Sequence, residues 1–213
     1  DGSFFKNPVL LEAINHAKRN NSNLHLLGLM GAGGVHSNIQ HLFALIQLAS
    51  RNSFKNVYLH LFTDGRDSPP TAAATYLKSI RDVLAKEGVG QIASLTGRYW
   101  AMDRDFRWER TAKAYFALTK GQGKLVPSLE SAITESYSTG KTDEFIEPCL
   151  VAGPDGKALT VIKDNDSVLF FNFRIDRPRQ LTSAFVFKDF APEKISWGFD
   201  PFLVKYTKSH LSA

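Results

Sequence analysis

The sequence predicts an α/β domain with three layers, in which a mostly parallel central sheet carries helices on both faces. Short, nearly continuous apolar runs alternate with segments whose apolar residues repeat at helical spacing. Polar loops follow four of these runs. The chain has 213 residues, of which 43% are hydrophobic, which is enough for a substantial core. This length and composition are compatible with one large domain or with two small ones.

The first helix and the first strand are marked by their boundaries. Asn7 followed by Pro8 is typical of a helix N-cap and first helical position, and the polar residues 20–23 end this helix. Residues 24–30 form a buried apolar run, which predicts a strand covered on both faces.

A glycine-rich loop follows this strand and leads into the second helix. The loop contains three glycines and ends near His36, and Ser37 and Gln40 have capping-box spacing, which predicts that Ser37 caps the helix. A strand, a glycine loop and a helix in this order can place backbone N–H groups and a helix N-terminus in front of an anion.

The strand–helix pattern continues along the chain. Further strands are predicted over residues 57–62, 91–96 and 168–173, and helical repeats over about 73–84, from Trp108 to Leu118, and near 129–137. The turn sequence GPDG at 153–156, between apolar runs at 149–152 and 158–162, predicts a hairpin. No element is predicted from Ala191 onward.

Polar loops follow four of the predicted strands, and we expect them to meet. The carboxyl ends of parallel strands lie at one edge of a sheet, where ligands of α/β proteins bind. Each loop alone has a simpler explanation, such as a capping histidine or a surface ion pair, but their convergence predicts a site. The residues are His36; Arg66 and Asp67; Arg98 and Arg104; and Arg174 and Arg177.

The residue types indicate a small ligand with more than one negative group. Several guanidinium groups can divide a phosphate and a carboxylate between them, and Asp67 can accept a hydrogen bond from a ligand hydroxyl. His36 can act as a hydrogen-bond donor or as an acid/base, and the sequence leaves both roles open. In the stretch 97–110, acidic residues interleave with the arginines, and we expect some of this charge to orient the rest.

Several other functions lack their sequence signals. The chain has no GxxxxGK[ST] loop, no complete dinucleotide fingerprint, no GxSxG motif and no metal-ligand spacing, and His25 and His60 are interpreted as structural. The net charge of +5 is spread along the chain, which makes nucleic-acid binding a minor alternative. With one cysteine, no signal-peptide pattern and no membrane-length apolar run, we expect a cytoplasmic protein without membrane or nucleic-acid partners.

Four long segments resemble motifs of the cofactor-independent (2,3-bisphosphoglycerate-independent) phosphoglycerate mutase family. They are GAGGVHSNIQHLFAL (31–45), LHLFTDGRDSPP (59–70), GRYWAMDRDFRWERTAKAY (97–115) and DNDSVLFFNFRIDRPRQ (164–180). The similarity runs in order from the start of the chain to about Phe190. The stretch from about Lys194 matches poorly and is expected to be a hinge or the end of the chain. Because the chain starts at Asp1 without methionine, we expect it to be a piece of a longer protein.

The resemblance implies that residues 1–213 form a single domain, the inserted substrate-binding domain of a two-domain enzyme of the alkaline phosphatase superfamily. It implies a glycolytic and gluconeogenic isomerase that interconverts 3-phosphoglycerate and 2-phosphoglycerate by intramolecular phosphotransfer through a phosphoserine. The serine and two manganese ions (Mn2+) belong to the phosphatase-like domain, which this sequence lacks, so the chain alone is expected to be inactive and to bind no metal. A monomer is expected.

The resemblance also implies substrate contacts for the residues that the loop argument selects. They are His36, Arg66, Asp67, Arg98, Arg104, Arg174 and Arg177. Our hypothesis is that Arg98 and Arg104 bind the carboxylate, Arg174 and Arg177 the phosphoryl group, while Asp67 orients a hydroxyl. The alternatives are a stand-alone binding module for phosphorylated carboxylic acids and a phosphopentomutase-like relative.

Overall fold

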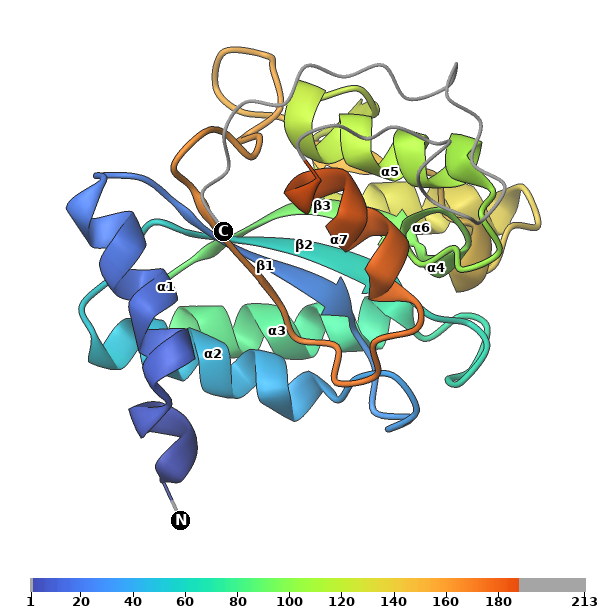
Figure 1. The fold of residues 1–213 in the computed structure, drawn as a ribbon. Helices are drawn as coiled ribbons and strands as arrows, with labels where there is room; N and C mark the ends of the chain where they lie inside the picture. The colour runs from blue at the N-terminus through green and yellow to red at the C-terminus, as the bar shows by residue number, and fades with distance from the viewer. Residues whose placement is uncertain (1, 188–213) are drawn as a thin grey trace.

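The computed structural model describes residues 2–187 and has the predicted α/β architecture (Figure 1). The strands are β1 (Leu24–Leu29), β2 (Val57–Thr63), β3 (Gln91–Gly97), β4 (Lys124–Val126), β5 (Cys149–Val151) and β6 (Ser167–Phe170). The helices are α1 (Pro8–Arg19), α2 (Ile39–Arg51), α3 (Ala73–Glu87), α4 (Arg98–Ala101), α5 (Trp108–Lys120), α6 (Leu129–Ser138) and α7 (Pro178–Val186), with 3-10 turns η1 (Ser3–Lys6) and η2 (Asp143–Phe145).

The strands form one sheet in the order β4-β5-β3-β2-β1-β6. Four neighbouring pairs are parallel, and only β3 and β5 pair in antiparallel fashion. Strands β1, β2, β3 and β6 therefore run in the same direction and end at the same edge of the sheet. This confirms the predicted mostly parallel sheet.

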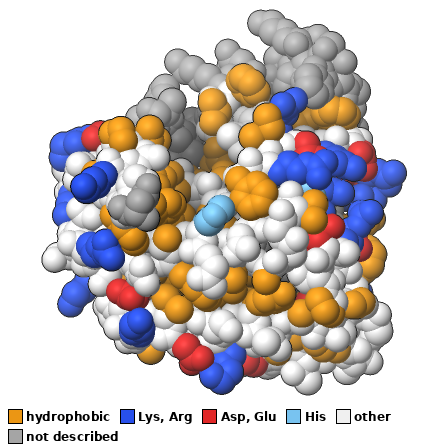
Figure 2. Space-filling view, turned by 90° about the horizontal axis from the view of Figure 1, so that it is seen from below, with side chains coloured by type: hydrophobic (Ala, Val, Ile, Leu, Met, Phe, Trp, Pro, Cys, Tyr) orange, Lys and Arg blue, Asp and Glu red, His pale blue; other side chains and the backbone are white. Residues whose placement is uncertain are grey.

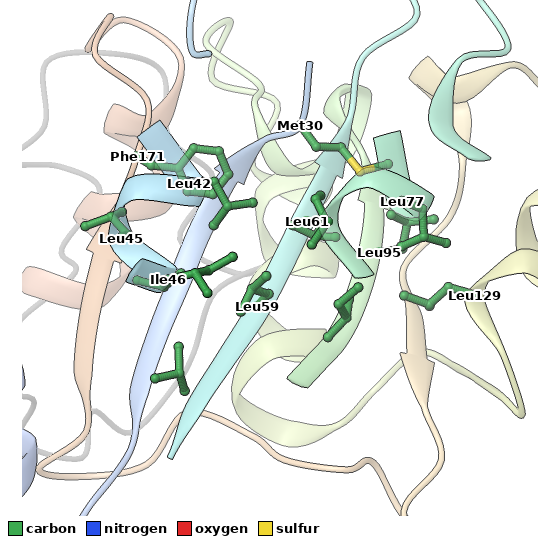
Figure 3. Close-up of a cluster of buried hydrophobic side chains, with 14 of the residues drawn as sticks. Met30, Leu42, Leu45, Ile46, Leu59, Leu61, Leu77, Leu95, Leu129 and Phe171 are labelled. Carbon is green, nitrogen blue, oxygen red and sulfur yellow. The ribbon is translucent and has the colours of Figure 1, made fainter. Parts of the chain in front are cut away.

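Helices cover both faces of the sheet, each over its own apolar cluster. In Figure 1, α2 and α3 lie below the sheet, and α5 and α7 lie above it. The larger cluster joins the sheet to α1, α2, α3 and α6, and Figure 3 shows Leu42 and Ile46 of α2 close to Leu59 and Leu61 of β2. The smaller cluster joins Leu27 and its neighbours to α5 and α7. The described helices include none long and apolar enough to cross a membrane.

The two predicted helix caps have different outcomes. Asn7 caps α1 as predicted, because its side chain accepts hydrogen bonds from the backbone N–H groups of Val9 and Leu10. The prediction for Ser37 is wrong, since Asn38 caps α2 by accepting from the backbone N–H of Gln40. The Ser37 hydroxyl instead donates to the carbonyl oxygen of Leu29 and holds the glycine loop against the end of β1.

The predicted hairpin around residues 153–156 forms only in part. The first apolar run becomes β5, but β5 is already paired with β4 on one edge and β3 on the other. The second run therefore cannot build a ladder, and it makes a single antiparallel bridge between Ala152 and Ala158. Strand β4 and helices α4 and α7 were not predicted from the sequence. The region from Ala191, including the expected hinge after Lys194, lies outside the described residues.

A buried line of polar side chains crosses the sheet from the start of β6 to β3. One ring nitrogen of His25 lies 3.0 Å from the Asp166 carboxylate, and the other lies 2.9 Å from His60. The second nitrogen of His60 lies 2.8 Å from the Ser94 hydroxyl. Every ring nitrogen in this line has a partner, so the structure supports the interpretation of both histidines as structural.

The buried histidine line predicts a loss of stability in acid. Burial, followed by the charge of His25, holds the pKa of His60 well below its usual value. Below about pH 6.5 this histidine takes up a proton in the unfolded chain, whereas His60 in the folded chain does not. The folding stability that His60 contributes is therefore present above that pH and is lost as the pH falls, at up to about 1.4 kcal/mol per pH unit. Urea unfolding of the wild type and His60→Gln should therefore show a weaker acid dependence in the variant. An equal dependence would contradict this, and His41→Gln, at an exposed histidine, is the control.

Candidate anion-binding site

The loops that follow β1, β2, β3 and β6 are joined by direct contacts. The backbone N–H groups of Phe173 and Arg174, after β6, donate to the carbonyl oxygen of His36, after β1 (3.0 and 3.3 Å). Arg98, which begins α4 directly after β3, donates to carboxylates of the β2 loop. The predicted convergence of the four loops is therefore confirmed, and the roles of the individual residues stay predictions.

Arg98 lies inside the site, where it connects two acidic residues. Only 2% of its surface is exposed, and its Nη1 atom lies 2.6 Å from both Asp64 and Asp67. The same Asp64 oxygen, Oδ1, also accepts the backbone N–H groups of Arg66 and Asp67 (3.2 and 3.1 Å). Asp64 and Arg98 thus fix the conformation of the loop that carries two of the predicted site residues.

Asp67 stays ionised because of its arginine neighbour. Burial alone would raise its pKa, but the hydrogen bond and the positive charge of Arg98 outweigh burial, and the pKa lies below its ordinary value. Its Oδ2 lies 3.8 Å from Nε2 of His36. Asp67 is therefore a hydrogen-bond acceptor at neutral pH, as its predicted role toward a ligand hydroxyl requires.

Asp176 joins the remaining loops. Its carboxylate accepts from Arg104 at 2.6 Å, lies 3.1 Å from Nε of Arg174 and lies 3.6 Å from Nδ1 of His36. Burial, followed by the charge of Arg98, lowers the pKa of His36 despite the nearby acids. His36 is thus neutral at pH 7 and can donate from one ring nitrogen while accepting at the other.

Arg177 differs from the other site arginines because it forms no ion pair within the described residues. Its Nη1 donates to the carbonyl oxygen of Met102 at 3.1 Å, and its Nε is buried without a partner. Burial and then the charges of Arg98, Arg104 and Arg66 lower the pKa of Arg177. These positive charges repel one another, and an anion placed among them would relieve the repulsion.

Arg66 lies at the exposed rim of this arrangement, 3.4 Å from Glu144. Figure 2 shows Lys and Arg side chains crowded on the side toward which the strand arrowheads of Figure 1 point, with acidic side chains among them. The site's arginines are Arg66, Arg98, Arg104, Arg174 and Arg177, and the carboxylates paired with them are Asp64, Asp67, Glu144 and Asp176. The arginines outnumber these carboxylates by one, so the arrangement favours a small anion.

The structure adds several residues that sequence reasoning did not select. Asp64 lies in the same polar loop as Asp67, and Asp103 lies among the arginines of 97–110, where acidic side chains were expected to orient the others. Asp176 lies between Arg174 and Arg177, in a loop for which a surface ion pair is the simpler explanation. Gln180 and Glu144 carried no signal, because the elements that bring them to the site, α7 and η2, were not predicted.

Gly33 allows the glycine loop to approach the β2 loop closely. A Cβ atom at Gly33 would overlap the backbone carbonyl of Asp67, which cannot move without moving Asp67 itself. We predict that Gly33→Ala separates the two loops and weakens binding of 3-phosphoglycerate, the ligand that the resemblance implies, by about 10-fold or more, as measured by calorimetric titration. Gly34→Ala is the control, because its left-handed φ of 70° brings a comparable backbone strain of about 1–3 kcal/mol while its Cβ meets open space. Equal affinities of the two variants would contradict the prediction.

A family model extends over nearly the whole chain. The family described as "BPG-independent PGAM N-terminus" matches residues 1–207. This match extends past Phe190, further along the chain than the four motifs predicted, so the expectation of a poor match from Lys194 is wrong.

Named relatives and a solved structure agree with this match. The chain is 52% identical over 202 residues to the 2,3-bisphosphoglycerate-independent phosphoglycerate mutase of Clostridium kluyveri, which covers 93% of the chain and 40% of that protein. It is 53% identical over 190 residues to such a mutase of Methanosarcina barkeri, covering 89% and 37%. A crystal structure of Leishmania mexicana phosphoglycerate mutase at low cobalt concentration superposes with a TM-score of 0.84 at 32% identity, covering 89% of this chain and 36% of that one.

The similarity covers only part of each relative, so it describes one part of those proteins. The chain spans about two fifths of the curated relatives that it matches, and the matched part is the one that the family description places at their N-terminus. The superposition also agrees with the three-layer α/β fold. The chain belongs to the N-terminal domain family of the 2,3-bisphosphoglycerate-independent phosphoglycerate mutases.

Proposed function

We propose that this chain is the substrate-binding domain of a phosphoglycerate mutase that interconverts 3-phosphoglycerate and 2-phosphoglycerate. The names of its relatives support the reaction, and the joined loops support the role of this domain within it. In this proposal the phosphoryl group passes to a serine of a second domain and returns to the other hydroxyl of the same glycerate, in a cytoplasmic and monomeric enzyme.

The observation that carries the proposal is the guanidinium of Arg177, which pairs with no carboxylate among the described residues. It is held among Arg98, Arg104 and Arg66, and within residues 2–187 its buried Nε has no hydrogen-bond partner. A buried donor without an acceptor is costly unless a ligand completes it. A phosphate or carboxylate oxygen placed against Arg177 would supply that acceptor and lower the repulsion between the arginines.

The other residues would bind and orient the same ligand. In the free chain, Asp176 forms ion pairs with both Arg104 and Arg174. A substrate anion would therefore compete with that carboxylate for the two arginines. Asp67, ionised and fixed by Arg98, would accept a hydrogen bond from a glycerate hydroxyl. Glycerate held by several charged groups cannot leave before it receives its phosphoryl group again, which protects the phosphoserine from hydrolysis.

We assign the metal chemistry of the proposed reaction to a part of the enzyme outside residues 2–187. Among residues 2–187, no three His, Cys, Asp or Glu side chains group in a way that could hold a metal ion. We propose that the two Mn2+ ions and the serine nucleophile belong to the remaining part of the longer enzyme.

The proposal predicts that substrate binding needs only this chain, whereas conversion of the substrate needs the full-length protein. This chain should bind 3-phosphoglycerate without converting it, and the full-length protein should convert it to 2-phosphoglycerate. Calorimetric titration of the chain and an NMR assay of product formation measure the two properties. If the full-length protein bound the ligand but formed no product, a stand-alone binding module would replace the enzyme in our account. If neither bound it, the site assignment would be wrong.

A further inference from the structure

A buried polar cluster connects the loop after β3 to helix α7, outside the predicted set of substrate contacts. The Gln180 side chain donates from Nε2 to the carboxylate of Asp103 at 2.9 Å and lies 3.1 Å from the hydroxyl of Thr111. Its Oε1 accepts the backbone N–H of Phe106 at 2.9 Å. The three polar side chains Asp103, Thr111 and Gln180 are each at most 4% exposed. We call this group the Asp103–Gln180 cluster.

The cluster fixes the backbone that directly follows Arg104. The carboxylate of Asp103 accepts the backbone N–H groups of Asp105 and Arg107 at 3.1 and 2.9 Å, and Gln180 accepts the one between them. Phe106 has a φ of 60°, in the left-handed region that is uncommon for a bulky residue. The loop therefore holds a strained conformation through side-chain hydrogen bonds, which can persist only while these partners stay in place.

The same cluster reaches Arg177 on α7. Arg177 and Gln180 are three residues apart at the N-terminal end of α7 and therefore lie on the same side of it. Arg177 donates to the carbonyl oxygen of Met102, next to Asp103, while Gln180 binds Asp103 itself. The loop that carries Arg104 and the helix turn that carries Arg177 are thus tied at two adjacent points.

We propose that Gln180 is a positioning residue that sets the separation of Arg104 and Arg177, and through it the affinity for a phosphorylated carboxylic acid. This inference rests on the proposed function, because it assigns both arginines to the substrate. Gln180 forms none of the site's ion pairs and acts through its hydrogen bonds alone. A neutral amide suits this role because it can donate to a carboxylate and accept from an N–H at once, whereas an apolar residue of similar size can do neither.

The first test replaces Gln180 with leucine in the full-length protein. Gln180→Leu should raise KM for 3-phosphoglycerate by about 10-fold or more, because small displacements of binding groups are costly. It should also speed amide hydrogen exchange at Phe106 on the order of 10-fold. Leu48→Ala, a buried change in α2 far along the chain from these loops, controls for lost stability and should move neither reading. A Gln180→Leu protein with parental KM would overturn the proposal.

The second test uses charge to separate positioning from general damage to the fold. In Gln180→Glu, the new carboxyl group faces Asp103, with Arg110 3.6 Å from Asp103 on one side and Arg177 one turn away on α7. Near pH 5, a proton shared by the two carboxyl groups restores the donor, and near pH 8 they repel each other. The ratio of variant to parental KM should therefore fall as the pH is lowered. A ratio independent of pH would overturn the proposal.

The proposed function and this inference fail in different ways. If the parental protein bound no 3-phosphoglycerate, the proposed function would fail, while amide exchange at Phe106 would still report whether Gln180 holds the loop. If the parental protein bound the ligand and Gln180→Leu bound it equally, only the inference would fail.

Discussion

An Arg98→Met variant of this chain is expected to lose about 3–5 kcal/mol of folding stability, the loss typical when one member of a buried ion pair is removed. Arg98 is almost fully buried, and its Nη1 neutralises Asp64 and Asp67 together. Without it, two neighbouring carboxylates would lose the cation that they share. Most domains are stable by only about 5–15 kcal/mol, so this is a large fraction of the total.

A mutant cycle measured by urea unfolding separates the repulsion between Asp64 and Asp67 from the loss of the packing of Arg98. Adding Asp64→Asn and Asp67→Asn to Arg98→Met should recover part of the stability, because the uncompensated charges are then gone. Arg98→Lys should fall between the parent and Arg98→Met, since one ammonium group lacks the planar fork of a guanidinium. An Arg98→Met protein within about 1 kcal/mol of the parent would contradict the buried role of Arg98.

An Arg177→Ala variant is expected to lose about 10- to 150-fold in affinity for 3-phosphoglycerate. A charge-assisted hydrogen bond contributes about 1.5–3 kcal/mol, and Arg177 is the site arginine that no carboxylate of the described residues engages. Arg179→Ala is a matched control because it removes the same charge from the same helix at an exposed position.

Comparing the two variants removes the general effect of net charge. Both should weaken long-range attraction of an anion equally, so any difference in affinity reports direct contact. Calorimetric titrations at two salt concentrations should show a loss for Arg177→Ala that persists in high salt and a small loss for Arg179→Ala that salt removes. Equal affinities of the two variants would remove Arg177 from the site.

The sequence was sufficient to predict the sheet and the convergence of its loops. The runs 24–30, 57–62 and 91–96 are apolar at nearly every position, because parallel strands are buried on both faces, and this signal is local. Once those strands are parallel, the positions of His36, Asp67 and Arg98 at one edge follow from geometry alone.

The missed features depend on contacts between distant segments. Strand β4 has three residues and two exposed side chains, so no apolar run marks it. Asn38 caps α2 in place of Ser37 because the end of β1 supplies a carbonyl acceptor for the Ser37 hydroxyl. Helix α7 follows an arginine-rich loop, and its contacts to residues 103–111 have no local signature.

The distribution of roles within the site was also beyond sequence reasoning. Arg98 and Arg104 are both arginines in the segment that follows β3. Nevertheless, Arg98 is only 2% exposed, whereas the Arg104 side chain is 42% exposed. The difference arises because Asp64 and Asp67 enclose the first and Asp176 holds the second near solvent. The division of carboxylate and phosphoryl binding between these arginines stays a prediction.

The central claim, that the four loops form one site for a phosphorylated acid, is tested most directly by titrating this chain with 3-phosphoglycerate while its amide NMR shifts are followed. Inorganic phosphate serves as the control ligand. Our account predicts shifts confined to the loops after β1, β2, β3 and β6, at ligand concentrations well below those at which phosphate acts. Shifts elsewhere, or a response identical to that of phosphate, would contradict it.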